Sequence, residues 1–253
     1  MLSRAFDKIS DVSKEMKKTK IVIMCGGRGK RLGEITEKIP KPLVKIGSQT
    51  ILQLKYENYY NQGFRDFIFC IGYKGDLIRN EVSSFAKDGN IEFSDSGEDA
   101  GILKRLHAAL PLMSDSIILT YGDTFTDLDL NQLVSLHEES KCEATIVVAP
   151  IQNPFGLVEF DSRNRVTSFK EKPTLNYYIG YAVLDKSSFD YAPEKVFHLE
   201  DGQGLVTFYK IMIALDKLNT FYHSGLQITF NTEDELKVAQ KQLIQFYTSV
   251  EEK

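Results

Sequence analysis

The sequence predicts an α/β fold in which a doubly wound, mostly parallel sheet of Rossmann-like type carries a small antiparallel insertion. From Lys20 to Ala149, short continuous apolar runs alternate with longer segments of helical periodicity. This alternation is typical of a parallel sheet covered by helices on both faces. The first apolar run, Ile21–Met24, reads as a buried central strand and leads into a glycine-rich turn. Because ligands of such sheets bind at the carboxyl ends of the strands, we expect the ligand site at this turn.

Four helices and four more strands are expected in this first part of the chain. Gly63 ends the first helix and Pro111 ends the third, because glycine and proline both disfavour continuation of a helix. The expected helices are Thr50–Gln62, Gly75–Ala86, Gly101–Leu110 and Leu130–Glu139. The expected strands are Phe67–Ile71, Ile91–Phe93, Ser116–Thr120 and Ala144–Ala149.

Beyond Pro150 the pattern changes, and short strands are separated by polar turns. We interpret this part as the antiparallel insertion, which we expect to cover one half of the ligand cleft. Its expected strands are Gly156–Phe160, Val166–Lys170 and Tyr178–Leu184. After it we expect a helix near Leu205–Leu218, a strand near Ile228 and a closing helix, Thr232–Tyr247. Glu235 stands three residues after Thr232, and this spacing predicts a capping box.

Residues 20–253 contain no internal repeat, low-complexity tract or proline-rich linker, so we expect a single domain there. Residues 1–19 precede it. Phe6, Ile9, Val12 and Met16 recur in them at helical spacing, which predicts an amphipathic N-terminal arm packed on the domain or on another subunit. This segment has no apolar stretch of the kind found in secretory signals.

Composition narrows the class of protein and its partners. The chain has 253 residues, of which 42% are hydrophobic and 26% charged, as in a soluble globular protein. The net charge of −4 argues against nucleic acid or an anionic membrane as a general partner. Cys25, Cys70 and Cys142 lack metal-site spacing and are expected to be reduced core residues. We therefore expect a cytoplasmic protein. We separately expect a homo-oligomer, a dimer.

The glycine-rich turn has the composition of a triphosphate-binding loop. Gly26, Gly27 and Gly29 let the backbone turn sharply and bring its N–H groups close to an anion. Five basic residues surround the turn, against only two carboxylates, Glu34 and Glu37. These basic residues are Arg28, Lys30, Arg31, Lys38 and Lys41.

Three other interpretations of the turn are weaker. The spacing of Gly27, Gly29 and Gly33 loosely matches a dinucleotide fingerprint, but that motif opens directly into a helix, and the two prolines in Thr36–Pro42 would stop one. A Walker-type loop requires a hydroxyl residue after its Gly-Lys pair, where this chain has Arg31. A surface turn with solvated charges remains the plainest alternative.

The run Gly26-Gly27-x-Gly29-x-Arg31-Leu32, followed by Pro40-Lys41-Pro42-Leu43, resembles the signature of the sugar-phosphate nucleotidyltransferases. The resemblance extends from about Lys20 to Gln240. It implies a Rossmann-like enzyme that joins a nucleoside triphosphate to a phosphorylated acceptor and releases pyrophosphate. It further implies that Arg31 contacts the leaving pyrophosphate and Lys41 the α-phosphate. The implied nucleotide-binding residues are Cys25, Gly26, Gly27, Arg28, Gly29, Gly72, Tyr73, Lys104, Tyr121 and Gly122.

Asp123 is the expected metal ligand and the third catalytic residue. Its carboxylate follows a glycine at a strand end and faces the basic loop, which suits a Mg²⁺ ion bridging phosphates. Family members carry their metal-binding aspartate in this Gly-Asp setting. They usually have a second aspartate near the C-terminus, where this chain has Thr229. Mg²⁺ tolerates this change, because it keeps several waters and needs only one or two protein carboxylates.

The resemblance also implies an acceptor site after Pro150. The segment Glu171-Lys172-Pro173 matches the family's Glu-Lys-Pro, whose lysine contacts the acceptor phosphate. Gly156 matches a glycine at which the family's backbone approaches the acceptor. Tyr178 stands where many sugar-binding members have an asparagine. We therefore expect Gly156, Glu171, Lys172 and Tyr178 in the acceptor site.

Two segments favour CTP as the nucleotide. Thr120-Tyr121-Gly122-Asp123 resembles the Thr-Tyr-Gly-Asp of glucose-1-phosphate cytidylyltransferases. Ser96–Arg105 resembles their Thr-Gly-Glu segment and the basic residues after it, except that Ile102 replaces an arginine. The whole chain resembles those members that transfer CMP to a phosphorylated amino acid, L-glutamine phosphate, in capsule phosphoramidate biosynthesis.

Three functions stay open from the sequence. The first is cytidylyl transfer to a small phosphorylated acceptor. The second is nucleotidyl transfer to a sugar 1-phosphate from CTP or another triphosphate. The third, prompted by Thr229, is a degenerate nucleotide-binding subunit without catalysis.

Overall fold

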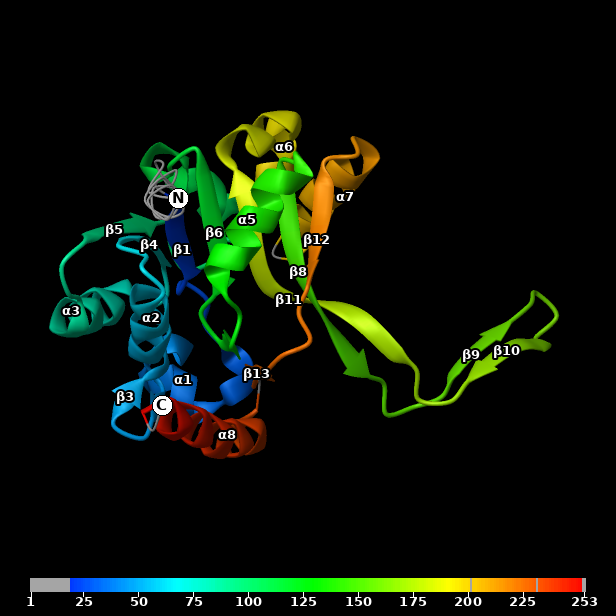
Figure 1. Ribbon diagram of the computed structural model, residues 1–253, viewed down its shortest axis with the longest axis horizontal. Coiled ribbons are helices and arrows are strands. Elements are labelled where there is room, and N and C mark those ends of the chain that lie inside the picture. The colour runs from blue at the N-terminus through cyan, green and yellow to red at the C-terminus, as the bar shows by residue number, and fades with distance from the viewer. Residues whose placement is uncertain (1–18, 201, 231, 252–253) are drawn as a thin grey trace, which may run out of the picture.

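The computed structural model describes residues 19–200, 202–230 and 232–251, and its centre is a seven-stranded sheet. The strands lie in the order β12 (Leu218–Tyr222), β8 (Ala144–Gln152), β11 (Thr174–Asp185), β6 (Ser116–Tyr121), β1 (Lys20–Met24), β4 (Asp66–Ile71) and β5 (Asn90–Asp95) (Figure 1). β1 pairs in parallel with β4 and β6, β4 with β5, and β12 with β8. Only β11 runs antiparallel to its neighbours. The expected mostly parallel α/β sheet is confirmed.

Helices cover both faces of the sheet because each buried strand presents apolar side chains on both sides. In β1, Ile21 and Ile23 belong to one core cluster and Val22 to the other. The first cluster includes α2 (Ile51–Asn61), α3 (Gly75–Phe85) and α5 (Leu130–Ser140). The second includes α4 (Ile102–Ala109), α6 (Glu194–Phe197) and α7 (Gln203–Ala214). The sheet is therefore doubly wound, and the four helices expected before Pro150 are confirmed to within one residue at each end.

A third apolar cluster lies beside the sheet and joins the segment after the glycine loop to the C-terminus. Its short elements are η2 (Lys30–Leu32), α1 (Glu34–Lys38), η3 (Lys41–Leu43), β2 (Lys45–Ile46), β3 (Gln49–Thr50), β7 (Thr124–Thr126) and β13 (Gln227–Thr229). The closing helix α8 (Glu233–Glu251) packs on them through Leu236, Ala239 and Leu243. The capping box is confirmed, because the Thr232 amide donates to Glu235 Oε2 and the Glu235 amide donates to Thr232 Oγ1, each at 3.3 Å.

The expected antiparallel insertion is wrong for one of its strands. Of the three expected strands, two form a separate antiparallel pair, β9 (Leu157–Phe160) and β10 (Val166–Lys170). In Figure 1 this pair projects away from the sheet instead of covering the cleft. The third expected strand, Tyr178–Leu184, is part of β11, in the middle of the main sheet. This strand lies inside the main sheet because its side chains are apolar on both faces: every residue from Ile179 to Leu184 is buried, as in a central strand.

Other differences are smaller. The helix expected to reach Leu218 ends at Ala214, and Leu218 instead begins the edge strand β12. Two further 3₁₀ turns, η4 (Leu110–Leu112) and η5 (Lys186–Tyr191), follow α4 and β11. The amphipathic arm expected in residues 1–19 lies outside the described residues except for Thr19. None of the described helices has the length and apolar character that crossing a membrane requires.

Candidate active site

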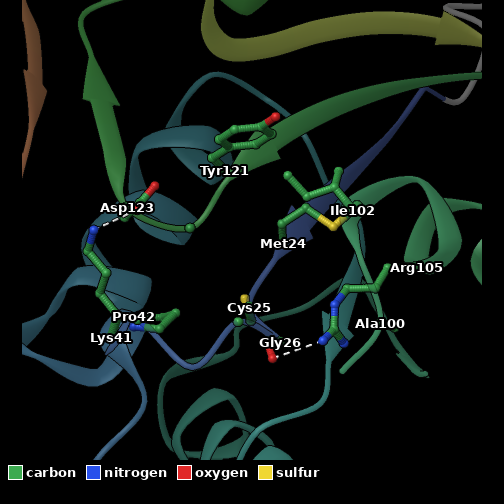
Figure 2. Close-up of a pocket in the computed structure, with 13 residues that line it drawn as sticks. Met24, Cys25, Gly26, Lys41, Pro42, Ala100, Ile102, Arg105, Tyr121 and Asp123 are labelled. Atoms are coloured by element: carbon green, nitrogen blue, oxygen red, sulfur yellow. Dashed lines mark hydrogen bonds and ion pairs between the residues drawn. The ribbon is translucent and has the colours of Figure 1, made fainter. Parts of the chain in front are cut away.

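A cavity of about 190 Å³ opens where β1 and β6 end, at the glycine loop (Figure 2). The end of β1 and the glycine loop form one wall, and the turn after β6 forms another. The lining residues are Met24, Cys25, Gly26, Gly27, Gly29, Lys41, Pro42, Ala100, Ile102, Arg105, Tyr121, Gly122 and Asp123. The cavity therefore lies at the carboxyl ends of parallel strands, where the fold predicts a ligand site.

Lys41 and Asp123 form an ion pair in this cavity. Lys41 begins the short turn η3, and only 8% of it is exposed. Its ammonium lies 2.6 Å from Asp123 Oδ2 and also donates to the carbonyl oxygen of Phe230 (Figure 2). A lysine and an aspartate that are 82 positions apart in the sequence are thus brought together, with both functional groups on the cavity.

The turn that carries Asp123 is fixed to the end of β1. The amide of Gly122 donates to the Met24 carbonyl at 3.1 Å. A Cβ atom at position 122 would lie 2.5 Å from that oxygen, so only glycine allows this approach. The position of Asp123 relative to the glycine loop is therefore determined by the backbone of both strands.

A buried network of polar side chains supports the turn that carries Asp123 from the interior of the protein. Lys55, 1% exposed in α2, donates to the carbonyl of Thr124 and to the hydroxyl of Tyr181, the latter at 2.9 Å. Tyr181 in turn donates to Thr124 at 2.9 Å and lies 3.0 Å from the Tyr59 hydroxyl. Burial opposes ionisation of the Tyr181 phenol, but the Lys55 ammonium lowers its pKa overall. This network holds the backbone directly after Asp123.

Arg105 joins three backbone segments around the glycine loop. It is 3% exposed, and its guanidinium donates to the carbonyls of Ile71 at 2.7 Å, Gly26 at 3.0 Å and Glu98 at 3.1 Å. A Cβ atom on Gly26 would lie 2.2 Å from Arg105 Nη1, and one on Gly72 would lie 2.4 Å from it. These two glycines are therefore required by the guanidinium as well as by the turn.

One carboxylate of this site is suited to binding a metal ion. Asp123 is the carboxylate on the cavity, with 31% of its side chain exposed. In the described part of the chain, no three histidine, cysteine, aspartate or glutamate side chains cluster as a metal site. β13 places Thr229 opposite Thr124, next to Asp123, so the position at which the resemblance led us to expect a second aspartate does lie beside Asp123. One carboxylate plus substrate phosphates and water is a normal set of Mg²⁺ ligands.

The cavity brings together eight of the residues predicted from the sequence. They are Cys25, Gly26, Gly27, Gly29, Lys41, Tyr121, Gly122 and Asp123. Gly72 packs against Arg105, and Tyr73 donates from its hydroxyl to the Thr36 carbonyl at 3.0 Å, outside the cavity. Lys104 is exposed on α4, and Arg31 is exposed on η2. Their roles stay predictions.

Arg28 and Glu98 form an ion pair between the tip of the glycine loop and the segment before α4. The Arg28 guanidinium also lies 5.3 Å from the centre of the Tyr73 ring. Neither Arg28 nor Tyr73 lines the main cavity, although both line a neighbouring hollow with Gly33, Thr36 and Glu37. In this structure Arg28 therefore holds the loop to its surroundings.

The predicted acceptor residues lie apart from the cavity. Gly156, Glu171 and Lys172 are exposed on the hairpin that projects from the sheet. Lys172 adopts a φ of 40°, in the left-handed region that side chains other than glycine rarely adopt. Tyr178 packs edge-on against Tyr121, which does line the cavity, with ring centres 5.9 Å apart. Desolvation of its hydroxyl raises the pKa of Tyr178 well above its usual range.

Five residues that line the cavity are absent from the predicted site residues given above: Met24, Pro42, Ala100, Ile102 and Arg105. Met24 and Pro42 adjoin predicted site residues, so sequence proximity is the signal that would have included them. Lys55 had a different signal, because it shares one helical face with Ile51 and Tyr59 and thus occupies a core position. A lysine within an apolar helical stripe indicates a buried side chain that donates hydrogen bonds inside the protein.

Alkylation should distinguish the cavity thiol from the exposed one. Burial raises the pKa of the Cys25 thiol far above its usual range and that of Cys70 to about 12. Because the thiolate is the reactive form, we expect iodoacetamide at pH 8 to spare both cysteines in the folded protein and to modify Cys142, which is partly exposed. Peptide mass spectrometry checks this, with urea-unfolded protein as the control in which all three react. Rapid modification of Cys25 in folded protein would contradict its burial.

A model of the nucleotidyl transferase family matches residues 20–200. The chain belongs to this family. This confirms the resemblance first found in the glycine loop and in the Pro40-Lys41-Pro42 segment, and it makes the chain a nucleotidyltransferase.

Curated nucleotidyl transferases agree with this assignment, and a solved structure has the same fold. The glucose-1-phosphate cytidylyltransferase of Salmonella typhi is 30% identical over 199 residues, which cover 68% of this chain and 77% of that protein. The D-glycero-alpha-D-manno-heptose 1-phosphate guanylyltransferase of Campylobacter jejuni is 29% identical over 184 residues, covering 71% and 82%. The crystal structure of HddC from Yersinia pseudotuberculosis has the same fold, with a TM-score of 0.67 at 21% identity over 89% of this chain and 99% of HddC.

Proposed function

We propose that this nucleotidyltransferase transfers CMP from CTP to the phosphate of a small phosphorylated acceptor and releases pyrophosphate. The observation that carries the proposal is the Lys41–Asp123 pair on a cavity bounded by the glycine loop. A cation and a carboxylate in contact, at backbone N–H groups able to approach an anion, suit a triphosphate with its metal ion.

The reaction needs alignment and charge neutralisation more than proton transfer. The acceptor phosphate is already an anionic nucleophile, so no general base is required. Lys41 would contact the α-phosphate, Arg31 the leaving pyrophosphate, and Lys172 the attacking phosphate. Asp123 would hold a Mg²⁺ ion, which would supply Lewis-acid stabilisation of the phosphate charge. To bind the triphosphate, the Lys41 ammonium would exchange part of its interaction with Asp123 for an interaction with a phosphate. Its hydrogen bond to the Phe230 carbonyl would keep the lysine in place.

CTP is the proposed nucleotide because the segment Thr120-Tyr121-Gly122-Asp123 resembles that of cytidylyltransferases and its last three residues line the cavity. The relative from Salmonella typhi is a cytidylyltransferase, whereas the one from Campylobacter jejuni transfers a guanylyl group, so the family alone does not fix the base. A site that pairs the polar edge of cytosine leaves buried groups unsatisfied by uracil.

We expect CTP to be used at least roughly tenfold better than UTP, GTP, ATP or dTTP, which is about 1.4 kcal/mol of transition-state discrimination. Pyrophosphate release, measured with each triphosphate in competition and with each candidate acceptor, checks this expectation. Asp123→Asn protein is the control for contaminating activity. Preference for a purine triphosphate would rule out the cytidylyltransferase proposal and leave the family assignment unchanged.

For the acceptor we propose L-glutamine phosphate, used in capsule phosphoramidate biosynthesis; CTP is made in the cytoplasm, so we propose that the enzyme acts there. Tyr178 and Thr229, which replace the usual asparagine and aspartate, support a departure from sugar substrates. A sugar 1-phosphate is the second candidate, because both curated relatives act on one by name. An acceptor panel run with CTP separates the two. No pyrophosphate release with any acceptor would favour the non-catalytic subunit.

A further inference from the structure

Lys55 is buried behind the turn that carries Asp123 and takes no part in the reaction as proposed. It lies in α2 and is 1% exposed. Five lysines pair with a carboxylate in the described part of the chain, and Lys55 is not one of them. Its ammonium contacts the Thr124 carbonyl, the Tyr181 hydroxyl and three aromatic rings, with 5.0, 5.3 and 5.4 Å to the ring centres. A buried charge gives little net stability compared with an apolar side chain of similar size, so stability does not explain this lysine.

Two donors hold the carbonyl of Thr124, the residue that follows Asp123. Lys55 donates to this oxygen from α2, and the Tyr181 hydroxyl donates to it from β11 at 2.9 Å. Thr124 is 6% exposed, so both bonds lie inside the protein. On the other side of Asp123, the Gly122 amide donates to the last carbonyl of β1 at 3.1 Å. The main chain is therefore anchored on both sides of Asp123.

The two donors are themselves fixed by buried side chains. Lys55 and Tyr59 are four residues apart in α2 and thus lie on the same face of the helix. The Tyr59 hydroxyl lies 3.0 Å from the Tyr181 hydroxyl and 2.9 Å from Thr120 Oγ1 on β6. Tyr59, Tyr181 and Thr120 are 2%, 1% and 0% exposed. Side chains of α2, β11 and β6 therefore leave the donors of the Thr124 carbonyl little freedom to move.

The direction of the Asp123 carboxylate depends on this anchoring. The side chain is 31% exposed at the cavity, where the Lys41 ammonium lies 2.6 Å from Oδ2 (Figure 2). Groups that orient a metal-binding side chain typically alter metal affinity by roughly 10- to 100-fold. Lys55 and Tyr181 are not among the residues that line the cavity, so an effect of either on the site passes through the main chain at Asp123.

We propose that Lys55 and Tyr181 are positioning residues: by holding the Thr124 carbonyl, they keep the Asp123 carboxylate in the direction in which it binds Mg²⁺ beside the triphosphate. The inference rests on the proposed function, which makes Asp123 the metal ligand. It explains why a charged side chain occupies a core position of α2.

Position and charge predict opposite effects of replacing Lys55. Lys55→Met keeps the length of the side chain and removes both hydrogen bonds together with the positive charge. If Lys55 acted through its charge, its loss would strengthen the binding of a divalent cation, because like charges repel. If it acts by position, its loss weakens that binding. Tyr181→Phe removes a donor to the same carbonyl without removing a cation, so we expect both substitutions to weaken metal binding.

Isothermal titration of CTP without any acceptor measures this effect apart from turnover. Each protein is titrated once with Mg²⁺ and once with EDTA, and the ratio of the two affinities is the factor by which the metal strengthens CTP binding. We expect this factor to fall by roughly tenfold in Lys55→Met and in Tyr181→Phe, the lower end of the range for residues that orient a metal ligand. CTP affinity in EDTA should stay close to that of the wild type.

Two further variants are the controls. Tyr59→Phe removes a hydroxyl from the same buried network but leaves both donors of the Thr124 carbonyl in place, so it should keep the wild-type factor. Asp123→Asn should abolish the factor, because it removes the charge that binds the metal. Every variant should give the circular dichroism spectrum of the wild type. If Lys55→Met does not fold, Tyr181→Phe still decides the test.

Three results overturn the inference and leave the proposed function standing. The first is an unchanged factor in Lys55→Met and Tyr181→Phe when Asp123→Asn has lost it. The second is a larger factor in Lys55→Met, which assigns the effect to charge. The third is an equal decrease in Tyr59→Phe and Tyr181→Phe, which assigns it to packing of the network as a whole. A wild-type chain that binds no CTP, or an Asp123→Asn chain that keeps the wild-type factor, is a failure of the proposed function instead.

Discussion

Replacing Asp123 with asparagine is expected to lower turnover by roughly 10³-fold, the scale seen when one preorganised charge-stabilising group is lost. The asparagine keeps the size of the side chain, and its oxygen still accepts a hydrogen bond from Lys41, so the pair at 2.6 Å is weakened without a cavity. What is removed is the negative charge, on which binding of a divalent cation beside the triphosphate depends.

The measurement is pyrophosphate release as a function of Mg²⁺ concentration, alongside thermal unfolding. Asp190→Asn, at an exposed carboxylate on η5 away from the cavity, is the charge-matched control and should keep wild-type kinetics. Asp123→Asn should unfold within a few degrees of wild type. Turnover that stays at the wild-type level in Asp123→Asn protein would mean that the metal site lies elsewhere.

The first half of the fold was predictable because its signals are local. Between Lys20 and Ala149 each strand of the main sheet and each helix that covers it has a local signal, an apolar run or a helical stripe, and Gly63 and Pro111 mark the ends of two of the helices. The short elements of the third cluster have no such signal. The strand Tyr178–Leu184, part of β11, was assigned to the insertion instead of the main sheet. Which strands it pairs with depends on segments far away in the sequence. The run Ile179–Leu184 is apolar enough for a central strand, but the sequence does not show that β6 and β8, from two distant segments, leave a gap for it.

The site residues also differ in whether local sequence signals could predict them. The glycine loop, Lys41 and Asp123 could be predicted because each belongs to a short sequence motif, and the structure brings them to one cavity. Arg105 is different. In the sequence it stands next to Lys104 as a basic pair on one helix, yet the structure buries Arg105 and exposes Lys104. Helical geometry separates adjacent residues by about 100°, so two neighbouring charges face different environments. Only packing of α4 on the sheet decides which one turns inward.

Arg105→Met should therefore be the most destabilising of the single substitutions considered for this site. The methionine has a similar length but no donor, and the carbonyls of Gly26, Ile71 and Glu98 each lose a charged hydrogen bond. Leaving a buried acceptor unsatisfied costs about 1–3 kcal/mol, and water entering from the cavity replaces part of the loss. We expect the free energy of unfolding to fall by about 3–4 kcal/mol, measured by urea denaturation.

The same substitution should also weaken nucleotide binding, because Arg105 holds the Gly26 backbone against the ends of β4 and of the segment before α4. Isothermal titration at a temperature where the variant is fully folded should show CTP affinity reduced by roughly tenfold or more, about 1.4 kcal/mol. Arg105→Lys keeps a charge that can reach fewer of the three carbonyls, and it should recover part of the stability. Lys104→Met is the comparison for stability, since an exposed substitution on the same helix shifts it by no more than about 0.5 kcal/mol. Equal losses in Lys104→Met and Arg105→Met would show that the charge of this helix, rather than the three carbonyl bonds of Arg105, maintains the loop.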